Sequence, residues 1–451
     1  MQIKNISNLP LIENCTICVV GLGYVGLPLA IEFSKIKVCL RTGKKLNRNV
    51  IGFDLNQKRI EQLKLGLDIT KETEEKDLNE FKSINFTSDL NKISTADVFI
   101  ISVPTPIDIN NNPDLNCLEK ATESIGEIIK ARKKPSNPVI IYESTVYPGT
   151  TEEICVPILE EKSGLIFNED FSCGYSPERI NPGDKEHRLT SIVKVTSGSN
   201  ETTAKWVDEL YGSIIEAGTY QAKSIQVAEA AKVIENTQRD LNIALINELA
   251  KIFKTINIDT LDVLEAAGSK WNFMPFRPGL VGGHCISVDP FYLTYKAKKH
   301  GYEPNIVLAG RKLNDGMSEW IVEQLLIAMK GKNISQKIAK VLILGLTFKE
   351  NCPDTRNSKV MDIILHLNKN GLIPYVYDPY IQNKIHVDND FIFLDKLSTD
   401  GSTKFDAIIL AVAHKEFKII DINEWRNLIN SNYIIYDLKG ILPRELNQMR
   451  L

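Results

Sequence analysis

The sequence has no long hydrophobic run and no excess of charge of one sign. No apolar stretch approaches the ~20 residues that a membrane-spanning helix needs, and residues 1–15 lack the basic and apolar regions of a secretory signal. The 451 residues include 54 Lys and Arg against 57 Asp and Glu, a net charge of −3, which provides no field for a polyanion. We therefore expect a cytoplasmic protein with no membrane segment and no nucleic-acid partner.

Cysteine pairs and metal-ligand spacings are also scarce. The eight cysteines are scattered through a long chain, which is typical of reduced thiols in the cytosol. Cys15 and Cys18 form a C-x-x-C, but they stand at the apolar run TICVV, which predicts a strand with buried structural thiols rather than a redox or metal pair. No second pair completes a zinc site, and the six histidines show no ligand spacing, so we expect no metal.

Three regions differ in their hydrophobic pattern. From about residue 14 to 212, short apolar runs alternate with amphipathic stretches, which predicts βαβ units and a mostly parallel sheet. The strand signal then fades, and the stretch QVAEAAKVIENTQRDLNIALINELAKIF keeps helical periodicity without a Pro or Gly. Strand-like runs return from about residue 338.

This layout predicts an α/β fold with two Rossmann-like parallel-sheet domains joined by a central helical domain that contains one long helix. We place the first Rossmann-like domain at residues 1–212, the helical domain at 213–330 and the second Rossmann-like domain at 331–451.

A glycine motif directly after the first predicted strand indicates a dinucleotide site. Gly21, Gly23 and Gly26 form G-x-G-x-x-G before a helix-like stretch, where a pyrophosphate can approach the backbone at a helix N-terminus. The second strand ends in Asp54, placed to bond the adenosine ribose hydroxyls, so the pattern favours NAD over NADP. Arg59 either lies beside the adenosine end of the cofactor or is a solvated helix residue.

The spacing between the glycines and Asp54 is longer than the roughly 20 residues usual for this unit. The excess is the polar, basic stretch RTGKKLNRN at 41–49, which we interpret as a surface loop. Two later strands end in VPTP and EST, and their Glu143, Ser144 and the threonines Thr105 and Thr145 would line the same crevice. Thr105 and Thr145 are therefore candidate NAD contacts.

The segment FRPGLVGGHCISVDPFYL carries the strongest catalytic signal. Gly282 and Gly283 allow the backbone to approach a ligand closely. Cys285 follows, shortly before Asp289–Pro290, which predicts a helix start that can lower the pKa of a thiol. His284 adjoins the cysteine, but adjacent residues in extended chain point to opposite sides, so we expect a structural or substrate-shaping role for it.

The long predicted helix places three polar residues on one face. Lys232, Asn236 and Asp240 are spaced four apart, so they form either a solvated polar stripe or a group that stabilises a developing oxyanion. Four apolar residues of the same helix suit either a homodimer interface or the core: Ile234, Leu241, Leu245 and Leu249.

The chain resembles the UDP-glucose/GDP-mannose dehydrogenase family throughout its length. Seven motifs occur in the family's order: GLGYVG, VPTP, ESTVYPGTTEE, SPERINPGD, EAAKVIENTQRDLN, GGHCISVDP and GLTFKENCPDTRNS. SPERINPGDKEHRL and FRPGLVGGHCISVDPFYL are most similar to the branch that acts on UDP-N-acetylhexosamines and makes uronic acids for surface polysaccharide.

The resemblance assigns roles around the thiol. Cys285 is the implied nucleophile, Lys232 and Asn236 hold the reacting oxygen and an ordered water, and Asp289 belongs to the same proton network. Glu178 is the acid that aids thioester hydrolysis.

Further contacts follow from the same resemblance. Thr145 lies near the catalytic water, Lys349 is implied to contact the substrate, and Arg356 is implied to contact the cofactor. Arg277 resembles a substrate-binding arginine that some relatives supply from a neighbouring subunit. We also place Arg179 and Gly282 with Glu178, Lys232 and Asn236 among the substrate-binding candidates.

The resemblance implies an NAD-dependent, four-electron oxidation of the 6-hydroxymethyl group of a UDP-sugar, with UDP-GlcNAc expected first. The same chemistry on UDP-GalNAc, UDP-ManNAc or UDP-glucose stays open. A two-electron alcohol dehydrogenase, which needs no thiol, would yield one NADH instead of two. A non-catalytic nucleotide-binding regulator would have no use for Cys285, Lys232, Asn236 and Glu178 together.

Overall fold

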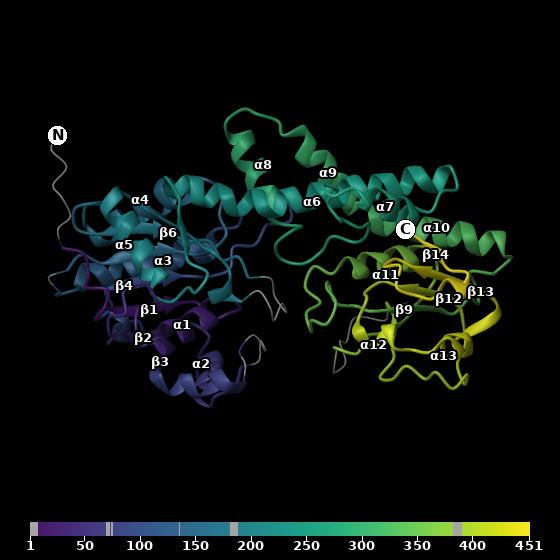
Figure 1. Ribbon diagram of the computed structural model, residues 1–451, viewed down its shortest axis with the longest axis horizontal. Helices are drawn as coiled ribbons and strands as arrows, with labels where there is room; N and C mark the ends of the chain where they lie inside the picture. The colour runs from purple at the N-terminus through teal and green to yellow at the C-terminus, as the bar shows by residue number, and fades with distance from the viewer. Residues whose placement is uncertain (1–7, 69–72, 74, 135, 181–187, 382–389) are drawn as a thin grey trace. The chain divides into compact units, whose positions relative to one another are not determined.

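The computed structural model describes residues 8–68, 73, 75–134, 136–180, 188–381 and 390–451. The chain divides into two compact units (Figure 1). The first contains the residues up to Glu235 together with Phe291–Tyr302, and the second contains Asn236–Pro290 and Glu303–Leu451. The predicted α/β class is confirmed, because each unit contains a sheet built largely of parallel strands.

The first unit contains an eight-stranded sheet in the order β3-β2-β1-β4-β5-β6-β7-β8. Its first six strands follow the strand order of a dinucleotide-binding fold. All neighbouring pairs are parallel except β6 and β7. The strands are β1 (Thr16–Val20), β2 (Asn49–Phe53), β3 (Ile84–Thr87), β4 (Val98–Ile101), β5 (Val139–Tyr142), β6 (Ser172–Tyr175), β7 (Lys194–Gly198) and β8 (Thr219–Gln221).

Helices complete the first unit. The helices α1 and α5 share one hydrophobic core with strand side chains, and α3 packs against α4. The central strands β4 and β5 are buried at every residue, as expected for a parallel sheet that is covered on both faces. These helices are α1 (Gly26–Lys35), α2 (Gln57–Lys64), α3 (Asn116–Ala131), α4 (Val156–Ser163) and α5 (Glu201–Gly212).

The residues of two helices are divided between the two units. The predicted long helix is α6 (Ile225–Thr255), with 31 residues, and the division between the units falls between its Glu235 and Asn236. The helix α8 (Asp289–Lys299) begins at the aspartate predicted to start it. No described helix is long and apolar enough to cross a membrane.

The second unit contains a six-stranded, parallel sheet in the order β11-β10-β9-β12-β13-β14. This order repeats that of β1–β6, so both sheets have the same topology. The strands are β9 (Val341–Leu344), β10 (Tyr375–Tyr377), β11 (Ile392–Phe393), β12 (Phe405–Leu410), β13 (Ile429–Asp437) and β14 (Met449–Arg450).

The strands of this sheet feed two cores because successive side chains alternate between its faces. Val341 and Ile343 pack with α10 and α11, whereas Leu342 and Leu344 pack with α12 and α13. The helices of this unit are α7 (Thr260–Gly268), α9 (Asn305–Asp315), α10 (Met317–Gly331), α11 (Lys359–Lys369), α12 (Lys415–Lys418) and α13 (Ile422–Asn427).

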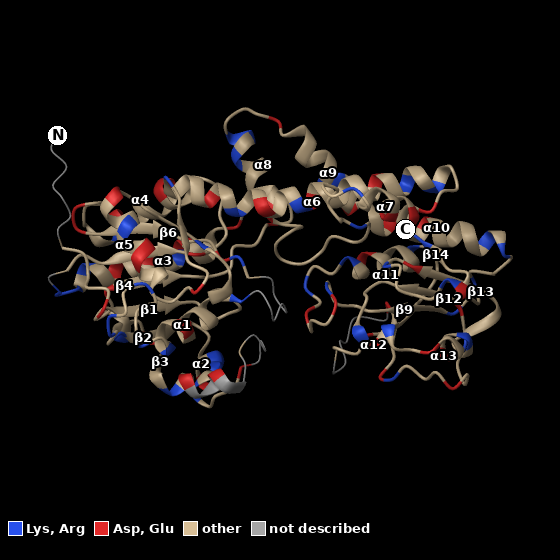
Figure 2. Ribbon diagram, in the orientation of Figure 1, with Lys and Arg blue, Asp and Glu red and all other residues tan. Residues whose placement is uncertain are grey.

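The sequence pattern did not reveal five strands, namely β3, β6, β8, β11 and β14. Four of them are short or partly polar, and β6 reads SCGY, whose Ser and Gly are depleted in strands. Charge of both signs is interspersed over both units (Figure 2), in keeping with the balanced composition.

Cys15 and Cys18 are buried and free, as predicted. Burial raises the pKa of Cys15 to about 11 and raises that of Cys18 further. These thiols are therefore structural.

Candidate active site

The glycine loop lies between β1 and α1 and is packed too tightly for side chains at two positions. Gly21 has φ +92°, and a Cβ on Gly26 would lie 1.9 Å from the Gly21 carbonyl oxygen. Ser102, directly after β4, donates its hydroxyl to that same carbonyl at 2.9 Å. A Cβ on Gly23 would meet nothing within 4 Å, so this face of the loop is open. The loop therefore fits a pyrophosphate at the start of α1.

Asp54 and Arg59 brace the loop from the adjacent strand and helix. Asp54 follows β2 and accepts a hydrogen bond from the Leu22 backbone N–H at 2.8 Å. Arg59 donates to the Leu22 carbonyl at 3.1 Å and forms an ion pair with Asp68 at 2.8 Å. Its side chain is only 7% exposed, so the solvated alternative for Arg59 is wrong. Arg59 supports the backbone on which the cofactor would lie.

The basic insertion at 41–49 is fastened to the first unit. Arg41 forms an ion pair with Asp208 at 2.6 Å, and Lys44 forms one with Glu13 at 2.8 Å. Arg48 donates to the carbonyl of Ile12 and the hydroxyl of Ser213, both at 2.8 Å. These three cations are thus engaged by groups other than Asp54. Asp54 therefore remains the charged residue expected at the ribose of the cofactor.

Thr105 and Thr145 lie together after β4 and β5. The Thr105 hydroxyl donates to the Thr145 carbonyl at 2.6 Å, and the Tyr292 hydroxyl donates to the Thr105 carbonyl. Tyr292 is fully buried, and sequence reasoning did not identify it. Its place in DPFYL, next to the cysteine segment, was the available signal.

Glu178 lies after β6, where its carboxylate accepts several donors. One oxygen accepts the backbone N–H groups of Arg179 and Ile180, each at 2.6 Å. The other accepts from the Lys194 ammonium at 3.3 Å. The Arg179 side chain forms an ion pair with Glu235 of α6 at 2.7 Å.

Lys232 and Glu229 occupy neighbouring turns of α6. Lys232 is 8% exposed, and its ammonium has no hydrogen bond or ion pair with the residues that the structure describes. Asn236 and Asp240 are buried as well, so the alternative of a solvated stripe is wrong. A largely enclosed lysine whose ammonium none of the described residues engages is suited to an anionic ligand or intermediate.

Glu229 was not identified from the sequence, although a Glu among small Ala residues three positions before Lys232 was the signal. Its carboxylate is fully buried and accepts from the Gly149 N–H at 2.5 Å, the Thr151 N–H at 2.9 Å and the Thr151 hydroxyl at 2.7 Å. Burial raises the pKa of Glu229 to about 7, although these donors oppose the rise. Glu229 thereby ties α6 to the segment that follows Thr145.

The cysteine segment lies in the second unit, before α8. Cys285 is half-buried, and its carbonyl accepts from the Asp289 N–H at 2.8 Å. Asp289 in turn accepts from the Asn236 side-chain amide at 2.6 Å, so the structure brings two predicted site residues together. Asp240 is instead engaged by Arg311 at 2.6 Å, which gives it a structural role in the second unit.

Gly282 and Gly283 allow other groups of the protein, and not only a ligand, to approach the backbone closely. A Cβ on Gly282 would lie 2.5 Å from the Asn357 carbonyl oxygen, and one on Gly283 would lie 2.7 Å from the Phe348 ring. His284 lies 3.0 Å from Asp354, whose carboxylate also binds the Arg356 guanidinium at 2.7 Å.

These contacts have an electrostatic consequence. Burial alone would raise the pKa of Asp354, but the hydrogen bonds from His284 and Arg356 hold it well below its usual value. His284 is thus a structural link between the cysteine segment and Arg356. Arg277 is exposed and has no hydrogen bond or ion pair with any described residue.

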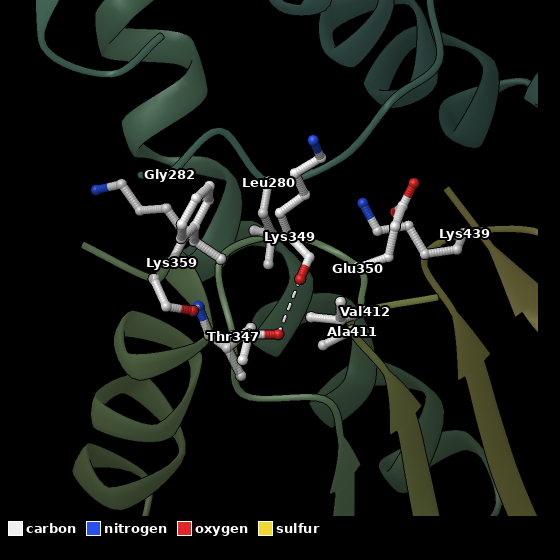
Figure 3. Close-up of a pocket in the computed structure, with 12 residues that line it drawn as sticks. Leu280, Gly282, Thr347, Lys349, Glu350, Lys359, Ala411, Val412 and Lys439 are labelled. Atoms are coloured by element: carbon white, nitrogen blue, oxygen red, sulfur yellow. Dashed lines mark hydrogen bonds between the residues drawn. The ribbon is translucent and has the colours of Figure 1, made fainter. Parts of the chain in front are cut away.

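A cavity of about 100 Å³ lies at the carboxyl ends of β9 and β12 (Figure 3). This edge is where the strand order of the second sheet reverses, the usual place for a ligand in such folds. Thr347, Lys349 and Glu350 follow β9, and the Thr347 hydroxyl donates to the Lys349 carbonyl at 2.9 Å. Ala411 and Val412 follow β12 and add an apolar wall.

Three lysines, Glu350 and one helix start line this cavity. Lys359 lies at the start of α11, and Lys439 follows β13. Burial lowers the pKa of Lys439, while Glu350 opposes that change. Lys349 lines the cavity as well. Lys359 is paired with Asp362 at 2.9 Å and Asp315 at 3.2 Å, so the helix N-terminus with Lys349 and Lys439 is the part of the lining that suits a diphosphate. Gly282 lines it too.

A glycine loop at the switch point of a dinucleotide-binding sheet, with an acid at the ribose position, defines the first unit as that of a nicotinamide-dependent dehydrogenase. Three family models agree: the NAD binding domain of the UDP-glucose/GDP-mannose dehydrogenase family matches residues 15–215, its central domain 226–316, and its UDP binding domain 342–444.

Relatives match over nearly the whole chain. The UDP-N-acetyl-D-glucosamine 6-dehydrogenase of Pseudomonas aeruginosa is 54% identical over 441 residues, covering 97% of this chain and 100% of the relative. The enzyme of the same name from Salmonella typhi is 52% identical, covering 98% and 99%. A solved UDP-D-ManNAc dehydrogenase from Pyrococcus horikoshii is 28% identical, has a TM-score of 0.82, and is matched over 96% of this chain and 98% of its own.

The chain belongs to the UDP-glucose/GDP-mannose dehydrogenase family. It is an NAD-dependent dehydrogenase, and the predicted NAD cofactor is confirmed by the matched NAD binding domain.

Proposed function

We propose that the chain oxidises the 6-hydroxymethyl group of a UDP-N-acetylhexosamine, UDP-GlcNAc first, to the carboxylate. The carrying observation is the 54% and 52% identity, over almost the full length, to two UDP-N-acetyl-D-glucosamine 6-dehydrogenases. The cavity at the ends of β9 and β12 supports a nucleoside-diphosphate ligand, because it combines three lysines with the start of α11. We also propose that residues 1–212 bind NAD, that residues 213–330 form a helical domain with the catalytic Lys232 and Cys285, and that residues 331–451 bind the nucleotide sugar.

The proposed reaction has four chemical stages. The alcohol loses a hydride and a proton to give the aldehyde, and the Cys285 thiolate adds to that carbonyl. The thiohemiacetal loses a second hydride to give a thioester, and water displaces the thiol to give the acid. Overall, one alcohol, two NAD⁺ and one water give one carboxylate, two NADH and three protons. NAD accepts the hydrides.

The chain's own groups have matching tasks. Negative charge develops on the same sugar oxygen at each stage, and the buried Lys232 ammonium stabilises it. Asn236, whose side chain is held by Asp289, donates its amide to the same sugar oxygen. Glu178 orients and activates the hydrolytic water, and Thr145 lies close to that water. Lys349, Arg179, Arg277 and Gly282 bind substrate, and Arg356, Arg59, Thr105 and Asp54 bind or support NAD.

The proposal extends to assembly and location. Ile234 and Leu245 of α6 are 52% and 54% exposed, which supports a homodimer formed along this helix. Leu241 and Leu249 are partly buried instead. The free cysteines support a cytoplasmic enzyme.

Product analysis tests the proposal. Purified protein is incubated with NAD and, separately, UDP-GlcNAc, UDP-GalNAc, UDP-ManNAc and UDP-glucose, and NADH and sugar products are measured. We expect two NADH per UDP-GlcNAc consumed and a uronic acid product. One NADH per sugar would show a two-electron dehydrogenase, and turnover of UDP-glucose alone would overturn the substrate branch.

A further inference from the structure

The first unit contains a buried cluster of charges that the proposed reaction does not explain. Lys194 points from β7 into the protein and is fully enclosed, with a side chain that is 3% exposed. Its ammonium lies 2.8 Å from Glu143, which follows β5, and 3.3 Å from Glu178, which follows β6. A charged group in a strand interior needs partners, because an unpaired buried charge is costly.

In this cluster Lys194 and Tyr211 donate hydrogen bonds and the two carboxylates accept them. One Glu143 oxygen accepts from Lys194, and the other accepts from the buried Tyr211 hydroxyl of α5. Glu143 therefore serves as a fully engaged counter-ion. One Glu178 oxygen accepts two backbone N–H groups, and Lys194 donates to the other oxygen.

The charges do not balance within the cluster. One ammonium faces two carboxylates, and burial raises the pKa of Glu143 although Lys194 opposes it. Burial alone would lower the pKa of Lys194, but the two carboxylates outweigh burial and raise it. Nearby, Arg179 and Glu235 neutralise each other as an ion pair at 2.7 Å. Lys194 and Glu143 thus place one positive and one negative charge beside the Glu178 carboxylate.

We propose that Lys194 is a positioning residue for the hydrolytic step: it fixes the Glu178 carboxylate and, balanced by Glu143, sets how readily Glu178 takes a proton from water. This inference rests on the proposed role of Glu178 in thioester hydrolysis. Lys194 itself touches neither substrate nor cofactor in this scheme. Its effect reaches the reaction through the 3.3 Å contact to Glu178.

Two substitutions should shift the same pH profile in opposite directions. Lys194→Met removes the cation, so the pH midpoint for decay of the Cys285 thioester should rise by about one unit or more. Glu143→Gln removes the second carboxylate and leaves Lys194 to Glu178 alone, so the midpoint should fall by about one unit. Lys194→Arg keeps the charge and should lie closer to wild type than Lys194→Met does.

The experiment mixes each full-length variant with NAD and UDP-GlcNAc, quenches at intervals from pH 5 to 9, and weighs the intact protein. The acyl adduct on Cys285 should persist longer in Lys194→Met than in wild type at pH values below the shifted midpoint, whereas in Glu178→Gln it should persist across the whole pH range. Arg132→Met is the matched control. It removes an equally enclosed cation that follows α3 and pairs at 2.5 Å with Asp97, the residue directly before β4. It should leave adduct decay unchanged.

The outcomes separate the two proposals. If Glu178→Gln retains the adduct while Lys194→Met and Glu143→Gln keep the wild-type pH profile, the inference is overturned and the proposed function stands. Shifts of the same sign in both variants also overturn it, because a general structural defect would produce them. If Lys194→Met does not fold, the downward shift in Glu143→Gln and the behaviour of Lys194→Arg decide. Absence of any adduct in Glu178→Gln despite NADH formation rejects the proposed hydrolytic role and the inference with it.

Discussion

Glu229 should make the stability of the first unit depend on pH in a predictable direction. The carboxyl is fully buried, and its pKa is raised from 4.5 to about 7. Between these values the folded protein binds a proton that the unfolded chain has released, so stability falls as pH rises through this range. At 1.36 kcal/mol per pKa unit, the raised pKa of about 7 corresponds to a loss of about 3 kcal/mol between pH 4.5 and pH 7.

Glu229→Gln tests this reasoning because the amide does not titrate. Gln keeps one acceptor oxygen for Thr151 but places an NH₂ group, which cannot accept, against the Gly149 N–H, whereas the protonated carboxyl of the wild type at pH 5 retains an acceptor there. We therefore expect the variant to be destabilised at pH 5 by about 1–3 kcal/mol, the cost of a buried donor left unpaired. The deficit should shrink as pH rises, because only the wild type loses stability on ionising.

The measurement is the urea midpoint of the full-length protein at pH 5, 6, 7 and 8, followed by circular dichroism. Glu201→Gln is the control, since Glu201 is an exposed glutamate of the same unit, paired with Lys205 at the surface. Its midpoint should track the wild type throughout. A difference between wild type and Glu229→Gln that stays constant or widens with pH would refute the raised pKa.

Three further predictions concern the reaction. NAD should be preferred over NADP because Asp54 would repel a 2′-phosphate; equal catalytic efficiency with both cofactors in steady-state assays contradicts this. Cys285→Ser should remain folded but lose steady-state turnover, because a hydroxyl without a dedicated base is a poor nucleophile; wild-type NADH formation by the folded variant would falsify the covalent route. Lys232→Ala should lower kcat by roughly 10²–10³-fold with a smaller change in KM; a change mainly in KM would make Lys232 a ground-state binder.

Much of the fold could be predicted because it depends on local patterns. The apolar runs that became β1, β4, β5, β9 and β12 are strands buried on both faces, which read as continuous hydrophobic segments. The strands β6 and β8 have no such signature, since one reads SCGY and the other is largely exposed. These two strands form because β6 pairs with β5 and β7, and β8 pairs with β7, in the folded sheet.

Features whose chemistry lies in consecutive residues can be read from the chain without its tertiary structure. The glycine loop, Asp54 at a strand end, the thiol before α8 and the four-residue spacing on α6 each need only one local element. Which groups far apart in the sequence lie in contact depends on the tertiary structure. Lys194, Glu143 and Glu178 come from three different strand ends or strands, and crossover connections bring them to one point. The orientation of Arg59 towards the Leu22 carbonyl was likewise set by burial of its helix face, because an enclosed guanidinium must bond to whatever acceptors surround it.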